Sequence, residues 1–328
     1  MAANSSPRAV VLAGGVGGAR FTAGLARVLP PEQIAVIVNV GDDFTHFGLH
    51  ISPDVDTVCY TLAGRENPAT GWGRTDETWH ALETIGELGG PTWFRLGDRD
   101  LGLHLERTRR LQAGQTLSQV TRAVCRAWDV RVAVLPVTDD PVPTVVDTVE
   151  HGPLAFQEYF VRLKSRPRVR GFTFEGAAQA RPAAGVLEAI AAAEVALFAP
   201  SNPWVSLDPI LAIPGVRDAL RAKTVVAVSP LIGGRAVKGP AAKMFAEMGI
   251  EPSALAVAQH YAGLVQGLVV DEIDAALAPR ITEATGQAVF ITDAWMPTPA
   301  RRRALAQATW DFAQALRRMP SLNDRQPD

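Results

Sequence analysis

Cysteine is scarce in this 328-residue chain, which contains only Cys59 and Cys125. Two thiols cannot form the disulfide framework of a small secreted protein, and they make a cysteine-based zinc site implausible. We therefore expect two partly buried free thiols in a reducing compartment.

Long apolar runs and a strong net charge are also lacking. No apolar stretch approaches the roughly 18 residues that a membrane span needs. The first residues lack the charged segment and apolar core of a signal peptide. The net charge of -2 gives no general attraction to nucleic acid or to anionic membrane. We expect a cytoplasmic protein that binds neither.

Short apolar runs recur along the chain and are nearly continuous in Val, Ile, Ala and Leu. Strands that are covered on both faces have this composition, which favours a parallel sheet. Amphipathic helical stretches separate the runs, and a long helix is expected from Ala300 to Met319. The pattern predicts a single α/β domain over residues 1–328 with a doubly wound, mostly parallel, Rossmann-like sheet. The expected strands are 8–13, 34–40, 130–137, 195–200, 224–230, 267–271 and 288–293.

Two stretches interrupt this alternation. Residues 60–128 read as a mostly helical insertion without a clear core strand. Residues 141–182 are rich in Pro, Arg and Gly and read as an irregular insertion, in which "VPTVVDTV" and "RPRVRGFTF" are possible exposed strands. We expect both insertions to pack over one edge of the sheet.

The first predicted strand runs into a glycine-rich loop with glycine at positions 14, 15, 17 and 18. Ligands of doubly wound folds lie at the carboxyl ends of strands, and glycine lets backbone N–H groups approach a phosphate at a helix N-terminus. The loop is therefore a candidate diphosphate cradle. It is neither a dinucleotide fingerprint, since Arg20 occupies the last glycine position, nor a Walker A loop. A tight turn without a ligand is the alternative.

The second predicted strand leads into an acidic loop that holds Asp42, Asp43, Asp54 and Asp56. Carboxylates beside a diphosphate suggest Mg²⁺, which prefers oxygen ligands. Ordinary loop and cap chemistry is the alternative; Asp56 could N-cap a helix that follows it. His46 and His50 share the loop, where pocket lining or hydrogen bonding is favoured over a transition-metal site.

Seven segments occur here in one order: "GGVGGARF", "NVGDD", "SPDVDT", "LGDRD", "TDDPVPT", "APSNPW" and "SPLIGGRAVKGPAAK". Together they resemble the 2-phospho-L-lactate transferase family of deazaflavin coenzyme F-420 biosynthesis, whose actinobacterial members are described as phosphoenolpyruvate transferases. The resemblance covers about residues 8–295. It implies an enzyme that takes a guanosine diphospho-donor and transfers a phosphoenolpyruvyl or 2-phospho-L-lactyl group. The acceptor is the ribityl hydroxyl of 7,8-didemethyl-8-hydroxy-5-deazariboflavin (Fo), and GMP is released. Mg²⁺ and a homodimer are implied as well, with the helical insertion over the acceptor side.

For such a reaction, the chemistry of the side chains suggests roles for individual residues, and the resemblance adds the contacts of Asp56 and Arg95 with Fo. Asp42 and Asp56 are expected to bind the metal, with Asp43 or Asp54 as helpers. Asp43 and Asp56 are the expected catalytic residues, with Asp43 favoured as the base, and Asp56 and Arg95 are expected against Fo. The expected donor-binding residues are Gly14, Gly15, Gly17, Gly18, Asn39, Ser201, Asn202, Ser229 and Lys238.

Less specific roles remain open for several of these residues. Arg95 could form a surface ion pair, Ser201 and Asn202 could simply form a turn, and Lys238 could belong to a solvated basic loop. Two other functions also stay open, a dinucleotide-dependent oxidoreductase and a non-catalytic nucleotide sensor. Enolpyruvate, lactate and glycerate are all possible as the transferred acid.

Overall fold

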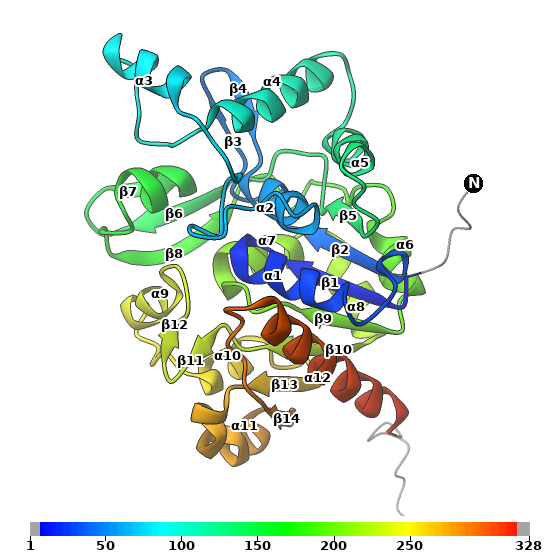
Figure 1. Ribbon diagram of the computed structural model, residues 1–328. Helices are drawn as coiled ribbons and strands as arrows, with labels where there is room; N and C mark the ends of the chain where they lie inside the picture. Colours follow the sequence, from blue (N-terminus) through cyan, green and yellow to red (C-terminus); the bar gives the residue numbers. More distant parts are fainter. Residues whose placement is uncertain (1–6, 320–328) are drawn as a thin grey trace, which may run out of the picture.

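The computed structural model describes residues 7–319, and its centre is a seven-stranded sheet in which every neighbouring pair is parallel (Figure 1). All seven predicted strands are confirmed. In the order in which they lie in the sheet, the strands are β14 (Ala288–Ile291), β13 (Gly267–Val270), β10 (Thr224–Val228), β9 (Val195–Phe198), β1 (Ala9–Ala13), β2 (Ile34–Val38) and β5 (Ala133–Pro136).

The chain winds outward from β1 in both directions, as the predicted doubly wound fold requires. β2 lies on one side of β1 and β9 on the other, so the strand order reverses between β1 and β9. Right-handed crossovers then place the helices of the two halves on opposite faces of the sheet. α1 (Gly15–Leu25) contacts α2 (Pro53–Leu62) and the long C-terminal helix α12 (Pro299–Arg318), which crosses the sheet beside it (Figure 1).

The two predicted insertions lie beside the β5 edge and over the carboxyl ends of the strands (Figure 1). The first contains α3 (His80–Glu87), α4 (Asp98–Gln112) and α5 (Leu117–Ala127), and the hairpin β3 (Phe44–His46) and β4 (Leu49–Ile51) lies against α4. The second contains an antiparallel sheet of β6 (Thr144–Thr148), β7 (Gly152–Ala155) and β8 (Val169–Phe174), which confirms the two strands predicted there. The predicted exposure is wrong for β6, in which Thr144, Val146 and Thr148 are buried. The remaining elements are η1 (Pro31–Gln33), η2 (Glu158–Arg162), α6 (Val186–Ala192), η3 (Pro203–Leu207), α7 (Asp208–Leu211), α8 (Val216–Arg221), β11 (Leu231–Ile232), β12 (Arg235–Ala236), α9 (Ala241–Glu247), α10 (Ala254–His260), η4 (Glu272–Leu277) and α11 (Ala278–Thr285).

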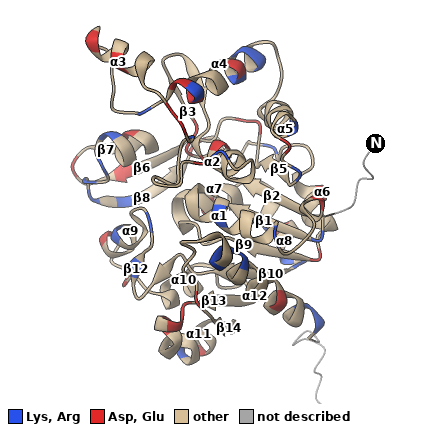
Figure 2. Cartoon of the chain, viewed as in Figure 1, with Lys and Arg blue, Asp and Glu red and all other residues tan. Residues whose placement is uncertain are grey.

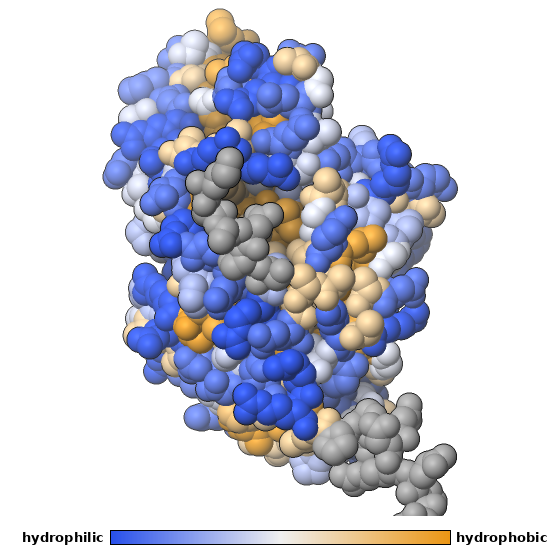
Figure 3. Space-filling model, turned by 90° about the vertical axis from the view of Figure 1, so that its right-hand side faces the viewer, coloured by the Kyte–Doolittle hydropathy of each residue, from blue (hydrophilic) through white to orange (hydrophobic). Residues whose placement is uncertain are grey.

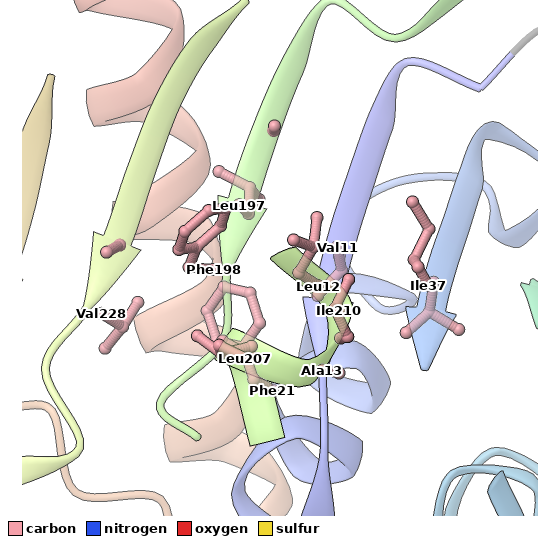
Figure 4. Packing of buried hydrophobic residues seen from close by; sticks show 14 of the residues in the cluster. Val11, Leu12, Ala13, Phe21, Ile37, Leu197, Phe198, Leu207, Ile210 and Val228 are labelled. Atoms are coloured by element: carbon pink, nitrogen blue, oxygen red, sulfur yellow. The ribbon is translucent and has the colours of Figure 1, made fainter. Parts of the chain in front are cut away.

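The core is built on the uncharged strands of the central sheet. β1, β2 and β9 are buried along their whole length, and Figure 2 shows the Lys, Arg, Asp and Glu residues on the surrounding helices and loops. Phe21 of α1 and Leu207 and Ile210 of the η3–α7 segment pack with strand side chains in this core (Figure 4). The face seen in Figure 3 is mostly hydrophilic.

Cys59 and Cys125 are both free thiols, as expected, and they are fully rather than partly buried. Their sulfur atoms lie 3.7 Å apart, between α2 and α5. No helix among the described residues is long and apolar enough to cross a membrane.

The contact between α1 and α12 generates a test of the packing. A Cβ on Gly24 would lie 2.3 Å from the carbonyl oxygen of Arg302, whereas one on Gly102, also inside a helix, would meet nothing within 4 Å. Gly24→Ala should therefore destabilise the fold by about 1–3 kcal/mol through overpacking. Gly102→Ala should be neutral or stabilising by up to about 1 kcal/mol. Urea unfolding of both variants measures this, and equal effects would show that α1 and α12 do not approach so closely.

Candidate functional site

The predicted glycine loop and the "PSNP" segment meet where the strand order of the sheet reverses. The loop follows β1, and Ser201 follows β9, the adjacent strand on the other side of the reversal. The buried Ser201 Oγ accepts from the N–H of Gly14 (3.2 Å) and donates to the carbonyl of Gly14 (2.8 Å). Such a switch point is where doubly wound folds bind their ligands.

Close packing explains most of the glycines in the loop. A Cβ on Gly14 would lie 2.5 Å from Asp54 Oδ2, and one on Gly17 would lie 2.4 Å from the carbonyl oxygen of Pro200. A Cβ on Gly18 would lie 2.9 Å from Ser201 Oγ. Gly15 alone of the four has a positive φ, +63°, and its Cβ would make only an ordinary contact, 3.8 Å from Asp54 Oδ1. Tight packing therefore accounts for Gly14, Gly17 and Gly18, whereas Gly15 is favoured by its positive φ.

Asp54 holds the glycine loop against the acidic loop. Its Oδ1 accepts from the N–H of Gly15 (2.6 Å), and its Oδ2 accepts from Asn39 Nδ2 (2.9 Å). Asn39 is fully buried, also donates to the carbonyl of Val205, and accepts from the N–H of Gly41. All polar atoms of the Asn39 side chain are thus engaged within the protein, so Asn39 positions the two loops rather than facing a ligand.

The carboxylates of Asp42, Asp43 and Asp54 crowd each other in a poorly hydrated place. Burial first, and then the charges of Asp54 and Asp43, hold the pKa of Asp42 well above its usual range. Burial also raises the pKa of Asp54 to about 6, although its bonds from Asn39 and Gly15 oppose the shift. The pKa of Asp43 is raised by burial too, against bonds from His50 and Ser52. A cation or protons must offset this negative charge.

Asp42 is the member of this group that fits a magnesium ligand. Its Oδ1 is buried and has no hydrogen-bond partner among the described residues, whereas both oxygens of Asp54 are engaged. No group of three or more His, Cys, Asp or Glu side chains within residues 7–319 forms a ready-made metal cage. Mg²⁺ is commonly held by one or two carboxylates together with substrate phosphates, and this donor set suits that mode.

Asp56 is in a different environment from the one expected. Both of its carboxylate oxygens accept from the buried guanidinium of Arg107 on α4. His104 lies beside this pair, and burial lowers its pKa to about 4. This geometry does not match the metal-binding and catalytic roles expected for Asp56, because the carboxylate is already neutralised. The capping alternative is wrong, since α2 begins at Pro53 with Ser52 as its N-cap residue.

A cavity of about 660 Å³ opens beside Asp42 and Asp43. Aromatic rings of Phe44, Trp93 and Phe156 line it, and Leu111 and Leu117 bring the helical insertion into its wall. Thr144 also lines it, and the Oγ1 atom of this residue is buried without a partner among the described residues. The cavity therefore has aromatic and aliphatic side chains in its wall beside the carboxylates of Asp42 and Asp43, which suits a planar ring that carries a polar chain.

Four other expected residues are not brought to this cavity. Arg95 is exposed, its guanidinium lies 4.3 Å from the centre of the Trp79 ring, and no ion pair to it is present among the described residues. Asn202 begins η3 by accepting from the N–H of Trp204, and Ser229 closes a turn through Leu231. Lys238 is exposed and donates to the carbonyl of Thr70.

The two histidines of the acidic loop have structural partners. His50 Nε2 lies 3.1 Å from Asp43 Oδ2, and Ser52 Oγ donates to the same carboxylate. His46 is buried among aromatic rings, including Phe44 and Trp93. These contacts agree with the favoured interpretation, pocket lining and hydrogen bonding.

Sequence reasoning missed Arg107, Trp93 and Phe156. Arg107 follows Leu103 by four residues and so lies on the buried stripe of α4, where an arginine signals a carboxylate partner. No comparable signal marked the two aromatic residues, because the insertions fold back over the sheet edge from distant segments.

Comparisons with known proteins agree with the predicted resemblance. The family model described as "2-phospho-L-lactate transferase CofD" matches residues 9–302. The phosphoenolpyruvate transferase of Thermobifida fusca is 47% identical over 94% of this chain and 99% of the relative. That of Streptomyces coelicolor is 49% identical over 84% of this chain and 89% of the relative. A crystal structure of a UPF0052-family protein from Bacillus halodurans shares the fold, with a TM-score of 0.56, 17% identity, and coverage of 88% of this chain and 93% of the other.

The Asp56–Arg107 pair makes a prediction about stability. Arg107→Met leaves a buried carboxylate without its partner and should lower the free energy of unfolding by about 3–5 kcal/mol. Arg109→Met, on the same helix but paired only with the exposed Glu106, should change it by less than about 1 kcal/mol. Urea unfolding measures both. An Asp56→Asn variant that loses all activity at unchanged stability would restore a direct catalytic role for Asp56.

The raised pKa of Asp54 predicts that the free energy of unfolding depends on pH. Since the folded pKa of Asp54 is raised to about 6, the folded state keeps a proton that the unfolded state loses near pH 4. This group's contribution to stability therefore declines as pH rises from about 4 to about 6.

Asp42→Asn removes one of the repelling charges. At pH 7 without metal, it should raise the melting temperature by roughly 2–4 °C, equivalent to about 1 kcal/mol in a large domain, and abolish stabilisation by added Mg²⁺. Asp218→Asn, at an exposed site, is the control. Melting curves with and without Mg²⁺ measure the effect, and a variant that Mg²⁺ stabilises as much as the wild type would exclude Asp42 as a ligand.

Proposed function

Because the chain belongs to the 2-phospho-L-lactate transferase CofD family, we propose that it transfers a phosphoenolpyruvyl group from a guanosine diphospho-donor to the ribityl hydroxyl of Fo, releasing GMP. Enolpyruvate is preferred over lactate as the transferred acid because the relatives at 43–49% identity carry the name phosphoenolpyruvate transferase. The product belongs to the biosynthesis of coenzyme F-420.

One observation carries this proposal: the aromatic-lined cavity and the glycine loop are joined through a single carboxylate cluster. Asp42 and Asp43 line the cavity, while Asp54, whose charge acts on Asp42, accepts from the N–H of Gly15. A planar acceptor in the cavity would thus place its chain next to a diphosphate at the loop. In-line attack on phosphorus needs this juxtaposition of hydroxyl, phosphate and cation.

The chain's own residues can prepare that attack. Asp43 faces the cavity and is held by Ser52 Oγ at 2.7 Å and by His50. Its raised pKa suits a base that accepts the proton of the acceptor hydroxyl. Asp42 would hold Mg²⁺, which would supply charge neutralisation at the phosphates.

The oxidoreductase alternative has less support. An acidic residue at the end of the second strand holds the ribose of a dinucleotide in Rossmann enzymes. Here Asn39 comes directly after β2, and its side chain is fully buried and bonded within the protein.

The proposed reaction is tested by product mass. The purified chain is incubated with Fo, Mg²⁺ and guanosine donors that carry enolpyruvate, lactate or glycerate. We expect the enolpyruvyl adduct of Fo and GMP, and no turnover in excess EDTA. The absence of product from every donor would contradict the proposed function, and full turnover in EDTA would contradict the need for a divalent cation.

Asp43→Asn tests the proposed base. The variant should lower turnover by about 10²–10⁴-fold, the usual contribution of a positioned general base. GDP affinity and melting temperature should change little, because Asn keeps the shape and can still accept from Ser52. Single-turnover rates with Fo measure the chemical step, and a wild-type rate would remove Asp43 from the mechanism.

A further inference from the structure

A cluster of positive charge lies near the start of α1, against Gly71 in the loop of residues 67–73. A Cβ on Gly71 would lie 2.8 Å from Arg20 Nη2, 3.1 Å from Lys238 Nζ and 3.1 Å from Val16 Cγ1. Three segments that are distant in sequence therefore meet at Gly71: the start of α1, the 67–73 loop itself and the segment before α9.

The positive charge in this cluster is not balanced within the described part of the chain. The charge of Arg20 is repelled by Arg302 and attracted by Glu66, and the charge of Lys238 is repelled by Arg20 and attracted by Glu66. Glu66 is the single carboxylate that acts on both Arg20 and Lys238 among the described residues. Both oxygens of Glu66 are already used, since Oε1 accepts from Arg302 Nη1 (2.9 Å) and Oε2 accepts from Thr61 Oγ1 (2.8 Å). Three cations thus face one carboxylate.

Arg20 is the least satisfied of the three cations. Its Nε is buried, and no hydrogen bond from its guanidinium is present within residues 7–319. Burial, and then the charge of Arg302, lower the pKa of Arg20; burial, and then Arg20, lower that of Lys238. Like charges held together without hydrogen-bond acceptors cost free energy, which an anion at this place would relieve.

The 67–73 loop is built to stay over the cluster. Gly71 is buried, and its N–H donates to the carbonyl of Asn67 (2.7 Å). Lys238 Nζ donates to the carbonyl of Thr70, which ties the loop to the basic segment. The backbones of Glu66 and Arg74 form an isolated antiparallel β-bridge at the base of the loop.

We propose that Arg20 and Lys238 bind the terminal phosphate of a nucleoside diphosphate at the N-terminus of α1, with residues 67–73 closing over it. This inference rests on the proposed function, because it assigns the cluster to the same donor. A guanidinium can make two parallel bonds to a phosphate, and a nearby ammonium adds a second charge. The neighbouring Val16 places that phosphate next to the backbone of the glycine loop.

The test compares GDP with GMP, which lacks the terminal phosphate, by calorimetry at constant ionic strength. The wild type should bind GDP more tightly than GMP. Arg20→Met and Lys238→Met should each reduce this preference by about tenfold or more, the usual effect of losing a charged hydrogen bond, while GMP affinity changes little. Arg27→Met, an exposed arginine in the turn that follows α1, is the control and should keep the wild-type preference.

Two loop glycines supply a matched pair of variants. Gly71 and Gly73 have φ of +72° and +70°, so an alanine strains the backbone equally at both, but only at Gly71 would its Cβ meet the cations. Gly71→Ala should reduce the GDP preference more than Gly73→Ala, with similar melting temperatures.

Three outcomes would overturn the proposal: a wild type that binds GDP and GMP equally, a full GDP preference in both Arg20→Met and Lys238→Met, or variants that lose only the complete donor and not GDP. The last would assign the cations to the carboxylate of the transferred acid. A wild type that shows the predicted GDP preference but makes no product from Fo would contradict the transfer reaction and leave this phosphate site standing.

Discussion

The hydrogen bond from the N–H of Gly15 to Asp54 is the contact on which the arrangement of the site depends. The other oxygen of the same carboxylate accepts from Asn39, which in turn binds Gly41 and Val205. One side chain at the start of α2 therefore fixes the loops that follow β1 and β2, and through Val205 it also fixes η3. The doubly wound sheet brings these loops to one edge, and Asp54 sets their separation.

This arrangement concentrates two groups of opposite charge near the glycine loop. Asp42 and Asp43 line the aromatic cavity, Asp54 binds the N–H of Gly15, and Arg20 and Lys238 lie against Gly71 of the 67–73 loop. Each group carries charge that the protein does not neutralise, and each is therefore costly in the free chain. A magnesium-bound diphosphate has the matching charge distribution, a cation for the carboxylates and phosphate oxygens for the arginine and lysine. The buried strands of the central sheet supply the stability that allows such a site.

The strands and loops that are marked by a local sequence pattern could be predicted from the sequence. The seven strands were found because each is a nearly continuous apolar run, and the glycine and acidic loops were found because they follow such runs. The pairing of Asp56 with Arg107 was not predicted, because Arg107 lies 51 residues away on α4, a separation that no local pattern encodes. Likewise, Gly17 is required because Pro200, which follows β9, packs against the loop, and no local pattern encodes this contact.

The central claim is that a divalent cation bound by Asp42 joins the acceptor cavity to the donor phosphates. A crystal of the chain grown with Mn²⁺ and GDP, measured for anomalous scattering at the manganese edge, tests it most directly. The account predicts one strong peak at bonding distance from Asp42 Oδ1, about 2.1 Å for a magnesium-type site, that also contacts a phosphate oxygen of GDP at the glycine loop. GDP bound at the loop with no metal peak beside Asp42, or with the metal on a different set of residues, would contradict it.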